Sequence, residues 1–248
     1  NIFFGVQAGC SLTSGDSNIF LGKDSNRCRT SGSQNISLGT YSAKRAESGS
    51  YNISIGKGAR ITATTGSDGI AIGRYAQRYV TGNCNIGIGM CAGTGASSGA
   101  SGTFNVAIGR YAGELFTSGT ANVFLGKNAG RSISTGSCNV ILGTYAMSAC
   151  AVTGNKNVAI GLHAGSKSTS LGGSVMIGAY AGCCTTVKDN NTFIGCGAGQ
   201  CNKGGSNTFL GVQAGCTVTG TSSCYNIFIG CAAGVCMTDG CRNIIIGC

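Results

Sequence analysis

The 248-residue chain has no proline, one histidine and only seven acidic residues, and these shortages exclude several classes of protein. A flexible glycine-rich linker usually contains proline and few large apolar side chains, whereas this chain combines 45 glycines with 42% hydrophobic residues. No apolar run reaches the roughly eighteen residues of a membrane span, so none is expected. Seven carboxylates are too few for an array of carboxylate metal sites, and we expect no cofactor.

The formal net charge is +10, from 17 basic and seven acidic residues. An excess of this size suits anionic partners such as lipopolysaccharide, acidic glycans or nucleic acid. The basic residues are nevertheless spread along the chain and never form a run of more than two. We therefore favour a solvated, self-repelling surface, keep anionic cell-surface glycans as an alternative partner, and expect no nucleic acid.

One short phrase, which reads NVFLG at residues 122–126, recurs along the whole chain. Nine of the fourteen spacings between its copies are 17 residues. A fixed short period indicates one structural unit stacked on copies of itself. The fifteen copies begin at Asn1, Asn18, Asn35, Asn52, Gly69, Asn85, Asn105, Asn122, Asn139, Asn157, Ser174, Asn191, Asn207, Asn226 and Asn243.

We number the first residue of each copy as position zero. Position one is always β-branched and position three is always Ile, Leu or Phe, which predicts a strand. Positions one and three share a face, which we expect to be the inside of the coil. Position four is always Gly, which predicts a corner with positive φ, and position seven is always Ala or Ser, which suits a narrow interior. The Asn at position zero favours one of two structural roles, a ladder of side-chain hydrogen bonds or a left-handed corner.

These features predict an all-β fold, a parallel β-solenoid of about fifteen 17-residue coils that forms a single array over residues 1–248. Position two, between the two predicted core positions, never carries a charge. An uncharged outward stripe favours lateral packing of copies in a homotrimer or a filament lattice. The alternative is a flattened coil whose two sheets both pack inward. The bulkiest members of this stripe are Phe3, Phe20, Phe124, Ile141, Met176, Phe193, Phe209, Phe228 and Ile245.

Sixteen cysteines favour an oxidising, extracellular setting with disulfides. Residues one repeat apart should have Cα atoms roughly 4.8 Å apart, within the usual disulfide range of about 4.4 to 6.8 Å. The alternatives are a Cys231–Cys236 bond, bonds between chains, and thiols packed as small apolar residues. The predicted staples are Cys184–Cys201, Cys224–Cys241 and Cys231–Cys248, each 17 residues apart, with Cys10–Cys28, 18 apart, as a looser fourth.

Position six carries tyrosine in alternate coils, close to a row of basic residues at position five. Such an edge could bind sugars or acidic polymers, although tyrosines that simply cover a turn are a common alternative. The tyrosines are Tyr41, Tyr75, Tyr111, Tyr145 and Tyr180. The basic residues are Lys23, Lys57, Arg74, Arg110 and Lys127.

We do not expect an enzyme or a bound metal. The single histidine, His163, falls at position six and is interpreted as a turn residue. The seven acids occupy different phases of the repeat and form no pair or triad. The Gly-x-x-Ala-Gly stretches lack the Lys-Ser/Thr ending of a phosphate loop, and the cysteine spacings do not suit zinc.

The phrases NTFLGVQAG at 207–215 and NVAIGRYAG at 105–113 resemble the repeats of phage tail fibres and bacterial surface fibres, and the head repeats of trimeric autotransporter adhesins. The resemblance covers the entire chain and implies a parallel β-roll or β-helix, usually trimeric, in a fibre that reaches or grips a cell surface. Since residue 1 opens a repeat, we expect a segment of a longer fibre. The expected function is that of a structural extracellular or virion-surface rod, with a receptor- or glycan-binding adhesin module as the alternative.

Overall fold

The computed structural model describes residues 1–97, 99–149, 153–185, 189–218, 220, 223–235 and 237–248, and it is an all-β solenoid of about fourteen turns. Each predicted phrase forms a three-residue strand, because a corner precedes it and Gly follows it. The strands are β1 (Ile2–Phe4), β2 (Ile19–Leu21), β3 (Ile36–Leu38), β4 (Ile53–Ile55), β5 (Ile70–Ile72), β6 (Ile86–Ile88), β7 (Val106–Ile108), β8 (Val123–Leu125), β9 (Val140–Leu142), β10 (Val158–Ile160), β11 (Val175–Ile177), β12 (Thr192–Ile194), β13 (Thr208–Leu210), β14 (Ile227–Ile229) and β15 (Ile244–Ile246).

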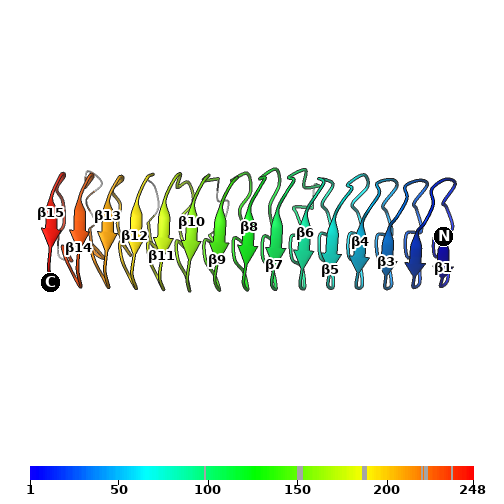
Figure 1. The fold of residues 1–248 in the computed structure, drawn as a ribbon, viewed down its shortest axis with the longest axis horizontal. Coiled ribbons are helices and arrows are strands. Elements are labelled where there is room, and N and C mark those ends of the chain that lie inside the picture. The colour runs from blue at the N-terminus through cyan, green and yellow to red at the C-terminus, as the bar shows by residue number, and fades with distance from the viewer. Residues whose placement is uncertain (98, 150–152, 186–188, 219, 221–222, 236) are drawn as a thin grey trace. The chain divides into compact units, whose positions relative to one another are not determined.

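The strands form one parallel sheet in sequence order, with neighbours paired in register, as Ile2 pairs with Ile19. The chain divides into two compact units, unit 1 (Asn1–Phe124) and unit 2 (Leu125–Cys248). Within each unit the strands lie side by side, and each is joined to the next by a loop that returns to the same side (Figure 1). The predicted parallel β-solenoid is thereby confirmed.

The Asn residues at position zero form the predicted ladder. The Nδ2 atom of Asn35 donates to Oδ1 of Asn18 at 3.0 Å, and Nδ2 of Asn18 donates to Oδ1 of Asn1 at 3.1 Å. The same oxygens also accept backbone N–H groups, so each Asn joins its coil to the next twice. Where Ser174 replaces Asn, its Oγ accepts the N–H of Asn191 at 3.2 Å, and the ladder continues. Buried amides that are paired in this way stabilise one register.

The corners use left-handed backbone, as predicted from the invariant Gly at position four. Gly22 has φ +124°, and a Cβ there would lie 2.7 Å from the carbonyl carbon of Gly39 in the next coil. The residues at positions six and eight and before position zero also have positive φ. Among the described non-glycine residues with positive φ, none is Val, Ile or Thr, because β-branched side chains clash in this conformation.

The predicted facing of the strands is wrong. The side chain at position two points into the coil, while the strand residues at positions one and three are exposed or half-buried in every strand. With only three residues between two corners, a strand presents just its middle side chain to the narrow interior. The residues predicted as an outward stripe that are instead 0% exposed are Phe20, Phe124, Ile141, Met176, Phe193, Phe209 and Phe228. Phe3 and Ile245, in the first and last strands, remain partly exposed.

Position eight also lies inside the coil, and its size complements that of position two. In unit 2 it is Gly wherever position two is Phe: a Cβ on Gly199 would lie 2.6 Å from the Phe193 ring, and one on Gly234 would lie 2.6 Å from the Phe228 ring. In unit 1 the reverse arrangement occurs at Gly87, where a Cβ would lie 2.9 Å from Cγ of Gln77. In these coils a large residue at one position is matched by a small one at the other, as close packing requires, whereas in the coil of β9 both residues, Ile141 and Met147, are large.

Two arginines fill the interior of unit 1. Arg60 donates to Oε1 of Gln77 at 2.8 Å and to the Gly66 carbonyl at 2.9 Å. Arg29 donates to Oδ1 of Asn26 at 2.8 Å and to the Gly49 carbonyl at 2.7 Å. Burial lowers the pKa of each guanidinium to about 10, and for Arg60 the nearby charge of Arg29 adds to this effect. Neutral oxygens, rather than carboxylates, thus accept these hydrogen bonds.

Candidate interaction surfaces

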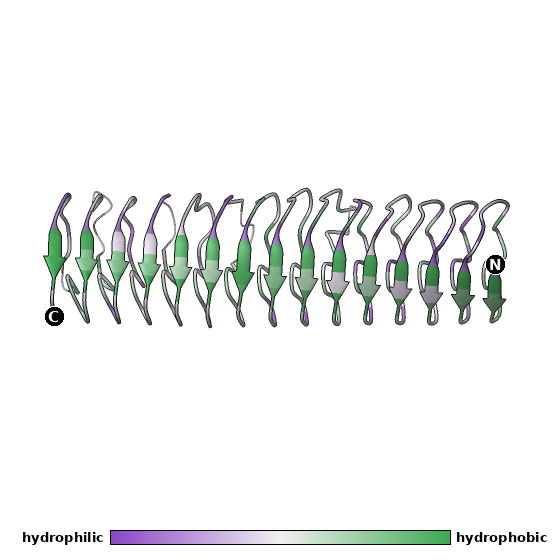
Figure 2. Cartoon of the chain, in the orientation of Figure 1, coloured by the Kyte–Doolittle hydropathy of each residue, from purple (hydrophilic) through white to green (hydrophobic). Residues whose placement is uncertain are grey.

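The outward face of the sheet is apolar in both units, and the strands are predominantly green in Figure 2. Exposed side chains at positions one and three include Val123 in unit 1 and Leu210 and Ile229 in unit 2, which are 36%, 43% and 36% exposed. The strands from β2 to β14 have a paired neighbour on both sides, and β1 and β15 on one side. This face therefore offers side chains, rather than backbone hydrogen bonds, to a partner.

The two units differ in what borders this face at position five. In unit 1 the border includes four exposed cations. These cations are Lys23, Lys57, Arg74 and Arg110. In unit 2 only Lys127 is basic at this position, and the following coils carry Thr144, Leu162, Ala179, Cys196, Val212 and Cys231. From Asn139 onward, positions zero to six of unit 2 contain no charged side chain.

The tyrosines at position six lie on a left-handed corner, and in unit 2 they stack with the single histidine. The ring centroids of Tyr145 and His163 are 5.2 Å apart, and those of His163 and Tyr180 are 5.3 Å apart, with nearly parallel planes. His163 is half-buried between the two rings, in the turn that the sequence predicted. His163 covers one ring face of each tyrosine, so these two faces are not open to a sugar.

In unit 1 the tyrosines at the same corner lie under cations. The guanidinium of Arg110 is 4.9 Å from the Tyr111 ring, and Nζ of Lys44 is 4.6 Å from the Tyr41 ring. Arg78 contacts two rings, at 5.0 Å from Tyr75 and 4.8 Å from Tyr79. A shallow hollow of about 350 Å³ lies beside Tyr79 and Arg45. This edge combines aromatic and cationic groups, which the corresponding edge of unit 2 does not do beyond Lys127 and Tyr145.

One predicted cysteine pair is brought together. The Sγ atoms of Cys224 and Cys241 are 3.0 Å apart, and the backbone N–H of Cys224 donates to Sγ of Cys241 at 3.3 Å. These hydrogen bonds lower the pKa of the Cys241 thiol, which favours the thiolate that disulfide formation requires. The geometry is that of a coil-to-coil pair, and the disulfide itself stays a prediction.

The other predicted pairs have a different status. The Sγ of Cys183 lies 3.3 Å from that of its neighbour Cys184, so Cys183 competes with Cys201 for this sulfur. The pKa of the Cys183 thiol is raised to about 11, first by burial and then by its hydrogen bond with Cys184. The pKa of the Cys201 thiol is also raised, first by burial and then by the charge of Cys184.

Cys10 is one position out of step with Cys28, and its thiol donates to the Arg27 carbonyl at 3.5 Å. Cys231 and Cys248 are both exposed, and Cys236 lies outside the described residues.

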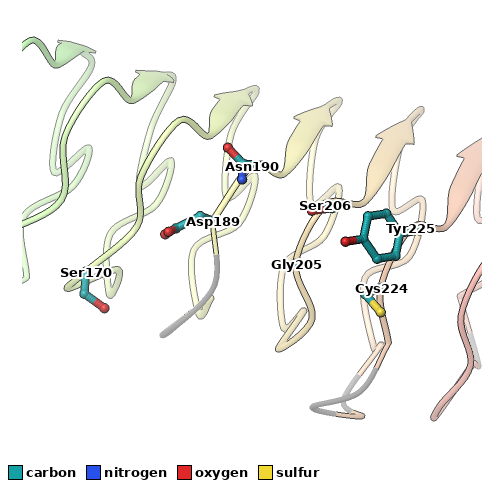
Figure 3. Close-up of a pocket in the computed structure, with 7 residues that line it drawn as sticks. All are labelled: Ser170, Asp189, Asn190, Gly205, Ser206, Cys224 and Tyr225. Atoms are coloured by element: carbon teal, nitrogen blue, oxygen red, sulfur yellow. The ribbon is translucent and has the colours of Figure 1, made fainter.

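An open hollow of about 620 Å³ lies on the loop side of unit 2 (Figure 3). Asp189, Tyr225 and Cys224 line it, together with Asn190 and small residues of neighbouring coils. Oδ1 of Asp189 accepts the backbone N–H of Gly172 at 2.7 Å, so this carboxylate holds a turn. The hollow is a surface depression lined by residues of neighbouring loops.

Among the described residues, no three or more His, Cys, Asp or Glu side chains gather as metal ligands would. The same residues include no helix with the length and hydrophobicity needed to cross a bilayer. Comparison with protein-family models, with curated proteins and with solved structures finds no match for this chain. The surfaces described above are therefore the basis for inferring a function.

Proposed function

We propose that the chain is a structural module, a rod segment of an extracellular fibre or of a virion-surface filament. The observation that carries this proposal is the coil-to-coil hydrogen bonding. The coils repeat one pattern of backbone bonds, and where two Asn residues follow one another in the ladder they add two side-chain bonds, as between Asn35 and Asn18. A solenoid gains stability with each added coil, which suits a spacer that must resist extension.

The composition and the cysteines support the proposed location. Sixteen cysteines in one chain are unusual for a reducing compartment, and Cys224 and Cys241 already lie in contact. Self-association, as a homotrimer or a filament, is the partner that the proposal implies. We propose that no catalytic step is involved, since the proposed role needs only shape and stability.

Electron microscopy of the purified full chain, together with sedimentation velocity, tests the structural role. We expect elongated particles with a width of one or a few coils and a high frictional ratio. Compact, roughly spherical particles would contradict the rod assignment. Non-reducing peptide mapping of the secreted chain tests the location, because an extracellular module should yield at least one coil-to-coil disulfide.

The aromatic and cationic edge of unit 1 favours a second candidate function, the binding of acidic glycans. Arg78 lies between Tyr75 and Tyr79, where it could present its guanidinium to a sulfate or carboxylate. A glycan array compared between the native chain and Arg74→Gln/Arg78→Gln tests this. Selective loss of sulfated or uronic-acid ligands would support an adhesin, and unchanged or absent binding would leave the structural role alone.

A further inference from the structure

The geometry points to the outward sheet face of unit 2 as the surface on which a second copy of this chain docks, face against face. We define this apolar face as the outward side chains at positions one, three and five from β9 to β15. The inference rests on the proposed structural role, because it names the surface through which such a module would associate. It replaces position two, which lies inside the coil, as the lateral contact.

The chemistry of the apolar face excludes most other occupants. It carries Ile, Val and Leu with Thr192 and Thr208 at positions one and three, and no charged side chain from positions one to five. Position five adds Thr144, Leu162, Ala179, Val212 and the cysteines Cys196, Cys231 and Cys248. Two cations, Lys156 and Arg242, lie one residue before the Asn ladder, on its flank. An anionic lipid surface or an acidic polymer would be attracted by basic residues within the contact itself. An extended peptide would need a free strand edge, whereas the strands here are paired on both sides from β2 to β14.

The spacing of the apolar face favours a partner with the same repeat. Its side chains stand in columns, one residue per coil, such as Ile194, Leu210 and Ile229 at position three. Neighbouring strands in a sheet are about 4.8 Å apart, and two sheets that interdigitate their side chains pack about 10 Å apart. Only a surface with the same period keeps its ridges in these grooves over several coils. A second copy supplies that period in a self-complementary contact.

The size of the face suits a weak contact between copies. Seven strands about 4.8 Å apart and three strand residues of about 3.3 Å give roughly 285 Å² of flat area per copy. Two such faces cover roughly 570 Å² in total, below the ~1,000 Å² expected of a stable interface, so we expect association that depends on concentration. The net charge of +10 opposes association, so a contact is expected where cations are absent, in unit 2 rather than along the basic border of unit 1.

The test is the mass of the full chain in solution, measured by sedimentation equilibrium over a hundredfold concentration range. We compare the native chain with Leu210→Lys/Ile229→Lys, which places two cations on the apolar face. The matched control, Ile55→Lys/Ile72→Lys, makes the same change at position three of β4 and β5 in unit 1. A second control, Thr217→Lys/Thr238→Lys, changes exposed residues of the coils that contain β13 and β14, away from the sheet.

We expect the native chain and both controls to form a dimer or a higher even assembly, and the face variant to have at most half the native mass. A milder variant, Leu210→Thr/Ile229→Thr, should weaken dimerisation by at least tenfold with an unchanged circular dichroism spectrum. Equal masses for the native chain and both face variants would overturn the inference, yet leave the structural role standing if particles are elongated. A monomeric native chain that sediments with neutral lipid vesicles would also overturn it, in favour of a membrane surface.

Discussion

Unit 1 is polar inside between β3 and β6, whereas unit 2 is aromatic inside between β12 and β14. In unit 1 position two is Ser37, Ser54, Ala71 and Gly87, and the space is filled by polar side chains such as Arg60 and Gln77. In unit 2 it is Phe193, Phe209 and Phe228, whose rings stack with centroids 5.1 and 4.6 Å apart. The strands and the Asn ladder are nevertheless the same in both. The coil is therefore specified by its corners and its ladder, and the interior needs only the right volume.

The largest loss of local stability should come from substitution of an aromatic residue inside unit 2. Phe209→Ala removes a fully buried ring that lies between two others, and Gly215 beside it cannot fill the space. We expect the local free energy of opening to fall by about 3–5 kcal/mol. Hydrogen exchange of the full chain, resolved by peptide, measures this in coils 12 to 14.

The matched change in unit 1 is Ser37→Ala, which removes one hydroxyl from position two. We expect a change of about 1 kcal/mol or less. An equal loss from both substitutions would show that interior volume is not what distinguishes the units.

Disulfide formation should stabilise unit 2 more than unit 1, because twelve of the sixteen cysteines fall in unit 2. Oxidation of Cys224 and Cys241 closes a loop of about 17 residues, worth around 3 kcal/mol in the chain-entropy model. Exchange protection in the last two coils should fall by that amount on reduction. In unit 1, Cys10 and Cys28 are one position out of step, and we expect them to be recovered as separate thiols. Recovery of Cys224 and Cys241 as alkylated thiols from the oxidised chain would refute the staple.

The ladder should respond equally in the two units. The Asn105 side chain in unit 1 donates to Asn85 and accepts from Asn122, and the Asn207 side chain in unit 2 donates to the Ser223 carbonyl and accepts from Asn226. Substitution of either by Ala leaves buried partners unsatisfied, and we expect a local loss of about 1–3 kcal/mol. Substitution by Ser should cost less, because Ser174 continues the ladder in the native chain. Unequal losses, measured by peptide-resolved exchange, would mean that the interior and the ladder are coupled.

The sequence predicted the period, the strands, the ladder and the glycine corners, because each depends on a residue type at a fixed position. It failed on which way the strands face. A three-residue strand with apolar residues throughout satisfies either facing, and a slip of one residue exchanges the two faces. The absence of charge at position two is equally typical of a core. The signal that could have decided was the size of paired positions: Phe193 with Gly199, and Ala71 with Gln77.

The candidate surfaces follow the same pattern. The apolar side chains at positions one and three were predicted to form the core. Because the strands face the other way, these side chains form the outward face of the sheet. Spacing brought Cys224 and Cys241 together correctly, because each lies two residues before an Asn of the ladder. The stacking of His163 between Tyr145 and Tyr180 could not be read from alternate tyrosines alone, since it depends on the ring orientation at a left-handed corner.

The smallest expected effect comes from Arg60→Met in unit 1. Methionine fills the space with an apolar side chain, while the Gln77 oxygen and the Gly66 carbonyl lose a donor. Replacing a buried charge by an apolar side chain of similar volume is often neutral or stabilising, so we expect a net change within about 1 kcal/mol at neutral pH. Urea unfolding of the full chain, followed by circular dichroism, measures it.

The pH dependence of the stability of the native chain and of Arg60→Met tests the effect of burying the Arg60 charge. The pKa of Arg60 is lowered by burial to about 10 from 12.5, so above pH 10 the unfolded chain holds a proton that the folded chain has released. The free energy of unfolding of the native chain therefore rises with pH in that window relative to Arg60→Met, which has no such proton. A difference that stays flat from pH 9 to 11 would mean that burial of the Arg60 charge costs the fold nothing.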